Sequence, residues 1–489
     1  MRLLSMNNTL SAPAERIPVS LRFLLLPLLF VAGFAVVFIV DAAHRVETQG
    51  FHVIASVNPL KAFCLLTIGS FFVMLLLRYP EVTLGLFFLV GLVKADPHLA
   101  TAPMDLTLAV GGLLIVACVY RLFTSKRPLK IPQEYFLYIP ILSMMVLSLT
   151  YTPDLAGGFD KFLRFICLTS LGILAPFILI DDARKLRRLF IAMTIGGLLI
   201  SIQSLTSTTG DDRLVSPSGL NTELGAASAI AIIVIWNMVF PNWSMLKRLL
   251  LYPVLGVLAV ALVGSGGRFA NAITVACVLL GALLCRKLIG DLIVVGVLGI
   301  LALPFIHVPE ASIEYLSSLG HPGGAMGTRD PLLKVGVQVF SQHPFFGVGL
   351  QGYRAVSPNP VTYNFPHNIF LELGAEMGLI AALAFLALAF YSFRESGRQI
   401  RDSFHRRDPL VVTVFLLLIY VFVDAMQSGD INDLRFMWFI LGLPFLLRNL
   451  EPAARVFAVP EHEFRQAYPN EVGPVIQPVH SLHGFPEYE

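Results

Sequence analysis

Apolar runs of about 20 residues recur from one end of the chain to the other, and they constrain its fold more than any other feature. Each run is long enough to cross the ~30 Å hydrocarbon core of a bilayer as a helix. Hydrophobic residues make up 56% of the chain and charged residues 14%, and the mean hydropathy is +0.75. In a typical soluble domain roughly a quarter of the residues are charged. The sequence therefore predicts an all-α polytopic membrane protein.

The spacing of these runs predicts about 14 transmembrane helices, with a range of about 12 to 14. We expect them at 21–40, 60–77, 82–95, 104–120, 134–150, 165–180, 189–206, 223–240, 249–264, 270–285, 288–306, 367–393, 410–427 and 435–450. The first run exceeds the h-region of a signal peptide, so we interpret it as a retained anchor. The resulting division is an N-terminus (1–20), helices 1–11 (21–306), a large outer loop (307–366), helices 12–14 (367–450) and a tail (451–489).

The distribution of basic residues predicts the orientation of these helices. With the N-terminus and the tail in the cytoplasm, the clusters "YRLFTSKRPLK", "DDARKLRR", "LKR", "CRK" and "RESGRQIRDSFHRR" all fall on the cytoplasmic side. Short cytoplasmic loops of membrane proteins carry such an excess of Lys and Arg. The net charge of +3 is too small to indicate a partner such as nucleic acid, and we expect none.

The loops on the outer side differ in the structure that we expect. The large loop 307–366 is rich in proline and glycine but contains apolar pieces such as "PLLKVGVQVF", which favours short amphipathic helices on the membrane surface. We expect three further loops at "SVNP" (56–59), "YTPDLAGGFDKFLRF" (151–165) and "STTGDDRLVSPSGLNTE" (207–223). The segment "FFGVGLQG" has the spacing of a dinucleotide fingerprint, but it lacks the βαβ context that gives this motif its meaning. We interpret it as a turn that lets backbone approach closely.

Neither a metal nor a cofactor is indicated. The five cysteines lie within expected helices and show no C-x-x-C spacing, so they predict neither a disulfide framework nor a zinc site: Cys64, Cys118, Cys167, Cys277 and Cys285.

Several isolated arginines fall on the outer side, against the charge bias: Arg164, Arg213, Arg268, Arg329 and Arg354. Taken singly, each is explained as an interfacial side chain whose guanidinium reaches the head-group region. Taken together, converging guanidinium groups would suit bidentate binding of phosphate oxygens. The set predicts a site for a strongly anionic head group such as a pyrophosphate.

The stretch "YNFPHNIFLELGAE" (363–376) places polar groups where an apolar helix begins. Asn368, Glu372 and Glu376 follow at a spacing of four and share a face, which we expect to point to the protein interior because carboxylates facing lipid are costly. For the two glutamates we favour hydrogen bonding to neighbouring helices. Gly374 and Gly378 lie on the other face and predict a G-x-x-x-G packing seam.

His367 is expected at the start of this helix, at the membrane boundary. One interpretation is an interfacial histidine that caps the helix. The other is a general base, since an imidazole accepts a proton near neutral pH. Asp424 and the "DIND" segment (430–433) are weaker candidates for chemistry.

At this point the residues resemble a known family. "FPHNIFLELGAEMGLIAALAFL" is similar to the His-Asn motif and following helix of the O-antigen ligase and O-antigen polymerase superfamily. "RDPLLKVGVQVFSQHPFFGVGLQGYR" resembles its arginine-plus-"HP-x-x-GVG" segment. "VGSGGRFANAIT" resembles its serine-arginine turn, with Gly267 in place of the usual serine, and "RLVSPSGLNTELGA" resembles its arginine-and-asparagine loop. The motifs cover about 213–386 in the family's order.

The resemblance implies a metal-independent, inverting glycosyltransferase at the periplasmic face of the bacterial inner membrane. Such enzymes transfer a glycan from an undecaprenyl-pyrophosphate carrier to an acceptor hydroxyl. His367 matches the position proposed to activate the acceptor, and Arg268 and Arg329 match those proposed to bind pyrophosphate. Arg213 is a third candidate. Arg164, Lys161, Asn368 and Glu372 are secondary ones.

The sequence leaves the acceptor open. Lipid A–core would make the protein an O-antigen ligase, and another lipid-linked glycan would make it a polymerase for O-antigen, capsule or exopolysaccharide, with a chain-length regulator as a possible partner. A protein serine would make it an oligosaccharyltransferase, which usually has additional soluble mass. The alternative from a different class is a flippase for the lipid-linked glycan. A flippase should carry polar groups across the whole bilayer, whereas here they concentrate at one face.

Overall fold

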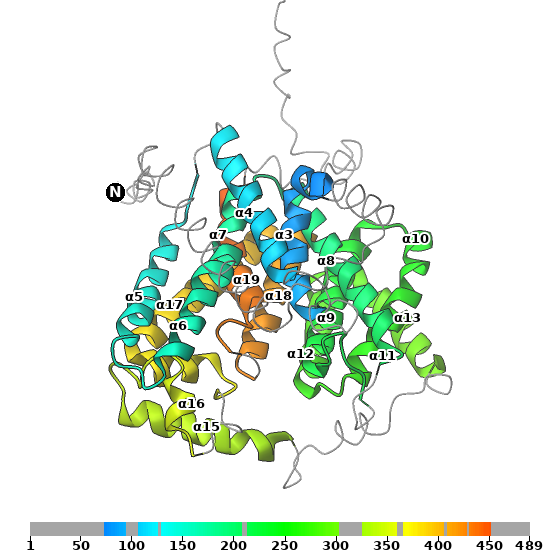
Figure 1. Cartoon of the computed structure of the whole chain (residues 1–489). Coiled ribbons are helices and arrows are strands. Elements are labelled where there is room, and N and C mark those ends of the chain that lie inside the picture. Colours follow the sequence, from blue (N-terminus) through cyan, green and yellow to red (C-terminus); the bar gives the residue numbers. More distant parts are fainter. Residues whose placement is uncertain are drawn as a thin grey trace, which may run out of the picture.

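The computed structural model describes residues 73–93, 106–125, 129–207, 213–302, 325–358, 365–404, 408–427 and 430–450. These residues form helices and turns, and none of them forms a strand, so the all-α prediction is confirmed for this part of the chain. The expected helix at 21–40, most of that at 60–77, and the tail 451–489 lie outside it. Figure 1 shows the helices running mostly between two ends of the molecule, with α15 (Ala325–Gln342) and α16 (Gly352–Val356) across the lower end.

Two apolar helices form the centre of the bundle. They are α18 (Pro409–Ala425) and α19 (Arg435–Asn449), and nearly every side chain from Met437 to Leu447 is buried. The helices around them are α3 (Pro80–Leu89), α4 (Leu106–Thr124), α5 (Tyr138–Ser148), α7 (Ser170–Leu179), α8 (Ala183–Ser204), α9 (Asn221–Val234), α11 (Leu251–Gly264), α12 (Arg268–Leu284), α13 (Leu288–Ala302) and α17 (Ile369–Phe404).

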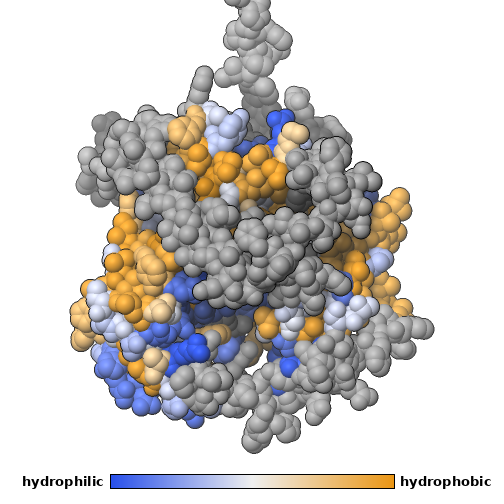
Figure 2. All heavy atoms as spheres, viewed as in Figure 1, coloured by the Kyte–Doolittle hydropathy of each residue, from blue (hydrophilic) through white to orange (hydrophobic). Residues whose placement is uncertain are grey.

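Large apolar side chains are exposed on the outer helices. Examples are Tyr120 on α4, Leu199 on α8, Leu283 on α12 and Ile300 on α13. Figure 2 shows hydrophobic residues on the two flanks and in the upper part of the molecule, with many hydrophilic residues towards the lower end. A surface of this kind suits contact with lipid chains rather than with water.

Six helices in the described residues are long and apolar enough to cross a membrane: Leu106–Thr124, Leu155–Leu179, Ala183–Ser204, Asn221–Asn242, Met245–Gly264 and Ile369–Asp402. Four more are apolar but shorter: Pro80–Leu92, Arg268–Leu284, Leu288–Leu301 and Pro409–Ala425. The chain is therefore a multi-pass membrane protein, and the predicted count of about 14 helices is not confirmed.

The prediction of a loop at 151–165 is wrong, because a helix begins inside it. The Asp154 side chain accepts a hydrogen bond from the Gly157 N–H (2.9 Å) and caps α6 (Leu155–Arg164). A π-helical turn, Phe165–Thr169, then joins α6 to α7 without interruption. The capping carboxylate starts the helix about ten residues before the apolar run from which we expected it.

Two of the basic segments meet at Asp181. Arg121 at the end of α4 pairs with Asp181, which precedes α8, and Lys185 also binds Asp181 (2.6 Å). Burial alone would raise the pKa of Asp181, but Lys185 and Arg121 hold it below its ordinary value. Arg448 at the end of α19 forms a bidentate pair with Glu134 (2.7 and 3.0 Å). The clusters "YRLFTSKRPLK" and "DDARKLRR" thus lie side by side, as the expected orientation requires.

Helix α17 is broken at Gly378, which contradicts our expectation of one continuous helix. Gly378 has φ 80° and ψ −173°, a conformation essentially confined to glycine. The break leaves backbone N–H and carbonyl groups of α17 without helical partners. The turn 343–352 provides the replacement hydrogen bonds. The N–H groups of Val348 and Gly349 donate to Ala375 O (2.8 Å) and Glu376 O (2.9 Å), and the Leu379 N–H donates to Pro344 O (2.8 Å).

The glycines of this turn confirm that it permits close backbone approach. A Cβ on Gly347 would lie 2.4 Å from the Glu376 carbonyl carbon, and one on Gly349 would lie 2.5 Å from the Thr152 Cα. The two glycines of the expected G-x-x-x-G seam therefore pack against α15 and the turn that follows it. A Cβ on Gly374 would lie 3.0 Å from the Phe340 ring, and one on Gly378 would lie 2.1 Å from Phe345 O.

Gly378→Ala tests the importance of this break. Because the added Cβ meets backbone and φ is positive, we expect a loss of about 3 kcal/mol or more in the free energy of unfolding. The matched control is Gly397→Ala in the same helix, where a Cβ meets nothing within 4 Å. That variant should be unchanged or more stable by about 0.5–1 kcal/mol. Equal stabilities in an unfolding titration of both purified variants would contradict the role given to Gly378.

Candidate functional site

The first turn of α17 is fixed by Asn368. Its Oδ1 accepts a hydrogen bond from the Leu371 N–H (3.0 Å), and its Nδ2 donates to Met426 O at the end of α18 (3.2 Å). The helix therefore begins at Ile369, and Asn368 is its cap, whereas we expected His367 and Asn368 to begin it. This cap ties the start of α17 to α18.

His367 immediately precedes the cap and has an unusual backbone. Its φ is +53°, in the left-handed region that non-glycine residues seldom adopt. Its ring is half-buried and lies 4.3 Å from the Phe365 ring, measured between centroids. A strained backbone of this kind is often found at functional sites, where the surroundings hold it in place.

One turn further along α17, two glutamates bind one buried lysine. Lys161 Nζ on α6 donates to Glu372 Oε1 (2.6 Å) and to Glu376 Oε2 (2.8 Å). The three residues are 4%, 0% and 1% exposed. The expectation that the acidic face points into the protein and bonds to a neighbouring helix is thus confirmed, and Lys161 is its partner.

The segment 430–434 closes the other side of this cluster. The Ile431 N–H donates to Glu372 Oε1 (3.3 Å), and Asn432 Nδ2 donates to the backbone carbonyl of Lys161 (3.0 Å). The second bond lies beside the π-helical turn that follows α6, where the regular hydrogen-bond pattern changes. Together these contacts fix α6, α17 and the start of α19 relative to one another.

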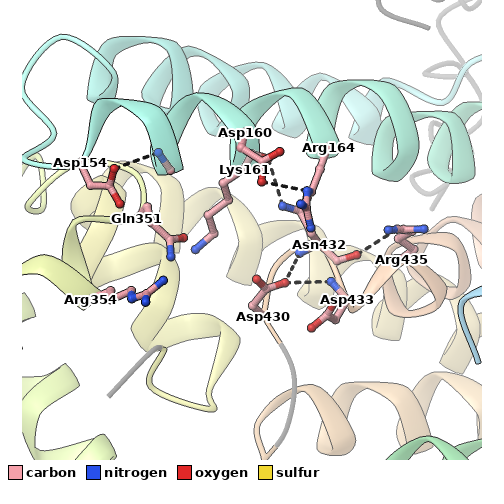
Figure 3. A pocket seen from close by; sticks show the side chains of 11 residues that line it. Asp154, Asp160, Lys161, Arg164, Gln351, Arg354, Asp430, Asn432, Asp433 and Arg435 are labelled. Carbon is pink, nitrogen blue, oxygen red and sulfur yellow. Dashed lines mark hydrogen bonds and ion pairs between the residues drawn. The ribbon is translucent and has the colours of Figure 1, made fainter. Parts of the chain in front are cut away.

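A polar cavity of ≈ 270 Å³ lies beside Lys161, between α6 and the segment 430–435 (Figure 3). Its lining comes from α6, from the turn that leads into α16, and from the segment before α19. The lining residues are Asp154, Gly157, Asp160, Lys161, Arg164, Gln351, Arg354, Asp430, Asn432, Asp433 and Arg435. Figure 3 shows the α6 side chains facing those of 430–435 across the cavity, with Gln351 and Arg354 beside them.

One backbone hydrogen bond joins the two segments that carry Arg213 and Arg268. The N–H of Leu214, next to Arg213, donates to Gly264 O (3.0 Å), at the turn that ends in Arg268. Arg268 starts α12 and is 8% exposed. Asn271 Nδ2 fixes this turn by donating to Gly267 O (2.8 Å). We call the joined segments 213–214 and 264–268 the arginine turn.

The predicted residues do not all meet in one place. Arg164 and Lys161 line the cavity, and Arg164 pairs with Asp160 (2.9 Å). Arg213, Arg268 and His367 do not line it. The backbone of Arg329 is helical within α15, and its side chain lies outside the described part of the structure.

Sequence reasoning missed most of the acidic and amide lining of the cavity. Asp154, Asp160, Gln351 and Arg435 were not candidates, and the segment 430–433 was only a weak one. The pattern of α6 contained a signal for one of them. Asp160 lies four residues before the candidate Arg164, on a helix whose other face exposes the apolar Leu155 and Phe159.

No cluster of His, Cys, Asp and Glu in the described ranges could hold a metal ion. Among the acidic side chains of the cavity, Asp160 is engaged by Arg164, and Asp154 and Asp430 accept from backbone N–H groups. What this part of the protein offers chemically is a set of fixed hydrogen-bond donors and acceptors.

A comparison with family models bears on this geometry. Residues 214–386 match the family model described as O-antigen ligase. The match supports the O-antigen ligase and polymerase superfamily that the sequence motifs resemble. The matched segment contains Arg268, Arg329, His367 and Glu372, and it begins one residue after Arg213. No curated protein matches the chain.

Lys161→Met tests the role of the buried ammonium. Without it two carboxylates remain buried with no cation, so we expect a loss of about 3–5 kcal/mol in the free energy of unfolding. The triple variant Lys161→Met/Glu372→Gln/Glu376→Gln should recover most of this loss, because no unpaired charge remains. The measurement is a denaturant titration of the purified proteins in micelles, followed by tryptophan fluorescence.

A second lysine provides the control. Lys185 binds Asp181 at the other end of the bundle, where both side chains are more than a fifth exposed (21% and 24%). Lys185→Met should therefore cost about 1 kcal/mol or less. If the triple variant Lys161→Met/Glu372→Gln/Glu376→Gln were as unstable as Lys161→Met, Lys161 would not stabilise the protein by neutralising the two glutamates.

Proposed function

We propose that the protein is a membrane glycosyltransferase of the O-antigen ligase or polymerase type, acting at the periplasmic face of the bacterial inner membrane. It transfers a glycan from an undecaprenyl-pyrophosphate carrier to the hydroxyl of an acceptor, which is lipid A–core or another lipid-linked glycan. The observation that carries the proposal is the family match over 214–386. That match includes the histidine and two of the arginines that we singled out.

The periplasmic orientation is supported by the charge distribution. Two of the basic segments meet where Arg121 and Lys185 bind Asp181, which makes that end of α4 and α8 basic. The start of α17 and the arginine turn lie at the opposite ends of their helices. By the positive-inside rule, the basic end faces the cytoplasm. The polar groups discussed above then face the periplasm, where the carrier's pyrophosphate linkage supplies the energy and no nucleotide is needed.

In the proposed reaction the acceptor oxygen attacks the anomeric carbon as the bond from that carbon to the pyrophosphate oxygen breaks. His367 takes the acceptor proton, and undecaprenyl pyrophosphate leaves with its negative charge met by Arg268, Arg213 and Arg329. Attack opposite the leaving group inverts the configuration at that carbon. Fixed guanidinium groups at a membrane boundary suit this role because they meet the developing charge without reorganisation.

Two features of the chain support His367 as the base. It lies next to the cap of α17, whose position is fixed by Asn368 and by the bonds to Lys161. Its half-buried ring is held beside Phe365 in a backbone conformation that histidine seldom adopts. Both features orient the imidazole before a substrate arrives.

His367→Asn and His367→Gly separate the imidazole from the backbone. Asparagine and glycine both tolerate a left-handed φ, so these variants should remain folded and inserted. If the imidazole is the base, both should lose roughly 10²–10⁴-fold in transfer rate. The measurement is glycan transfer in membranes with matched protein levels. Near-normal transfer by either variant would reduce His367 to a residue required only for the turn.

The lipid-linked glycan in a strain lacking the protein distinguishes the remaining alternatives. Single repeat units accumulating on the periplasmic carrier would identify a polymerase, and long chains left on the carrier would identify a ligase. Units trapped on the cytoplasmic leaflet would identify a flippase and overturn the transferase proposal. The readout is extraction of the lipid-linked glycans with sizing and leaflet-specific labelling, compared with a complemented strain.

A further inference from the structure

The cavity beside Lys161 has a charge balance unlike that of an anion site. Among its lining residues are four aspartates and four cations, which sum to a formal charge of zero: Asp154, Asp160, Asp430 and Asp433 against Lys161, Arg164, Arg354 and Arg435. A pyrophosphate there would lie beside four carboxylates, and like charges at close range are strongly unfavourable. The cavity therefore suits a neutral ligand.

The chemistry of the lining also excludes an apolar ligand. Besides the charged groups it presents the amides of Gln351 and Asn432, so nearly every surface is a hydrogen-bond donor or acceptor. An apolar ligand would displace water from these groups and leave them unpaired, at a cost of about 1–3 kcal/mol each. Hydroxyl groups both donate and accept, and so they can pair with carboxylates, amides and guanidinium groups together.

The acceptor groups of the cavity are already oriented. Asp430 Oδ1 accepts from the N–H groups of Asn432 (2.8 Å) and Asp433 (2.9 Å), and Asp154 Oδ1 accepts from Gly157 (2.9 Å). Groups held in this way lose little entropy when a ligand binds.

The floor of the cavity is equally rigid. Lys161 is held by Glu372 and Glu376, and its backbone carbonyl accepts from Asn432. The cavity volume of ≈ 270 Å³ corresponds to about nine waters at ~30 Å³ each, enough for one pyranose ring.

The location connects the cavity to the proposed reaction. Glu372, which binds the floor lysine, lies five residues after His367, a rise of about 8 Å along a helix. A ligand in the cavity would thus lie within the length of a short saccharide of the proposed base.

We propose that this cavity is a saccharide subsite that binds one neutral sugar unit of the glycan through its hydroxyl groups, separately from the arginine turn that meets the pyrophosphate. This inference rests on the proposed function. It adds that recognition of the sugar and recognition of the leaving group use different, separately mutable residues.

The test measures two ligands on the full-length protein in nanodiscs. Saturation-transfer NMR detects binding of glucose, galactose and N-acetylglucosamine, with glucuronate as the charged comparison. Phosphorus NMR line broadening detects inorganic pyrophosphate. The pocket variant is Asp160→Asn/Arg354→Gln, which removes one charge of each sign from exposed lining positions. Its matched control is Arg401→Gln/Asp402→Asn, the same chemical change at exposed positions in the last turn of α17.

We expect at least one neutral sugar to bind the wild type, and its signal to fall at least five-fold in the pocket variant and not in the control. Pyrophosphate binding should be equal in the wild type, the pocket variant and the control. It should be lost in Arg268→Lys, because an ammonium cannot replace the bidentate guanidinium. A thermal melt of each variant confirms that it is folded.

Three results would overturn the saccharide subsite. They are no binding by any neutral sugar, a sugar signal unaffected in the folded pocket variant, and loss of pyrophosphate binding in that variant. Failure of the proposed function gives a different pattern. Pyrophosphate would then not bind the wild type, or would bind Arg268→Lys equally well, whatever the sugars do.

Discussion

The structure depends on how the broken helix α17 satisfies its backbone. In an apolar environment an unpaired N–H or carbonyl costs several kcal/mol, so a break is tolerated only where other groups replace the lost bonds. The turn 343–352 does this with the N–H groups of Val348 and Gly349 and with the carbonyl of Pro344. At the break, the backbone of α17 is thereby hydrogen-bonded to the turn 343–352 rather than to the next turn of its own helix.

This arrangement explains the buried ionic cluster. The first part of α17 carries Glu372 and Glu376 into the interior, where two carboxylates without a cation would be strongly destabilising. Lys161 reaches them because α6 packs closely on the same turn. A Cβ on Gly158 would lie 2.7 Å from Leu350 O, so only a glycine permits this approach. The helix break, the glycine turn and the lysine therefore depend on one another. His367, whose backbone φ lies in the left-handed region, directly precedes the first turn of this part of α17.

The polar groups at this end of the bundle fall into two sets with different electrostatics. In the arginine turn, the bond from Leu214 to Gly264 joins the segments that carry Arg213 and Arg268. The cavity balances its cations with carboxylates and holds both in fixed positions. A transferase of the proposed kind has two things to recognise, a charged leaving group and a neutral sugar, and this division matches those needs.

The sequence by itself determined the all-helical membrane class, the resemblance to the O-antigen ligase family, the inward acidic face of α17 and the close backbone approach of the "FFGVGLQG" turn. These follow from apolar run length, motif order, helical periodicity and glycine spacing, all of which are local properties. It did not determine the start of α6 at Asp154, the break at Gly378 or the cavity. A capping side chain outweighed the apolar pattern in the first case, and hydrogen bonds from a distant turn replaced helical ones in the second. Only the tertiary structure could pair Lys161 with glutamates more than 200 positions away, because that pairing depends on which helices pack together and not on any pattern within one of them.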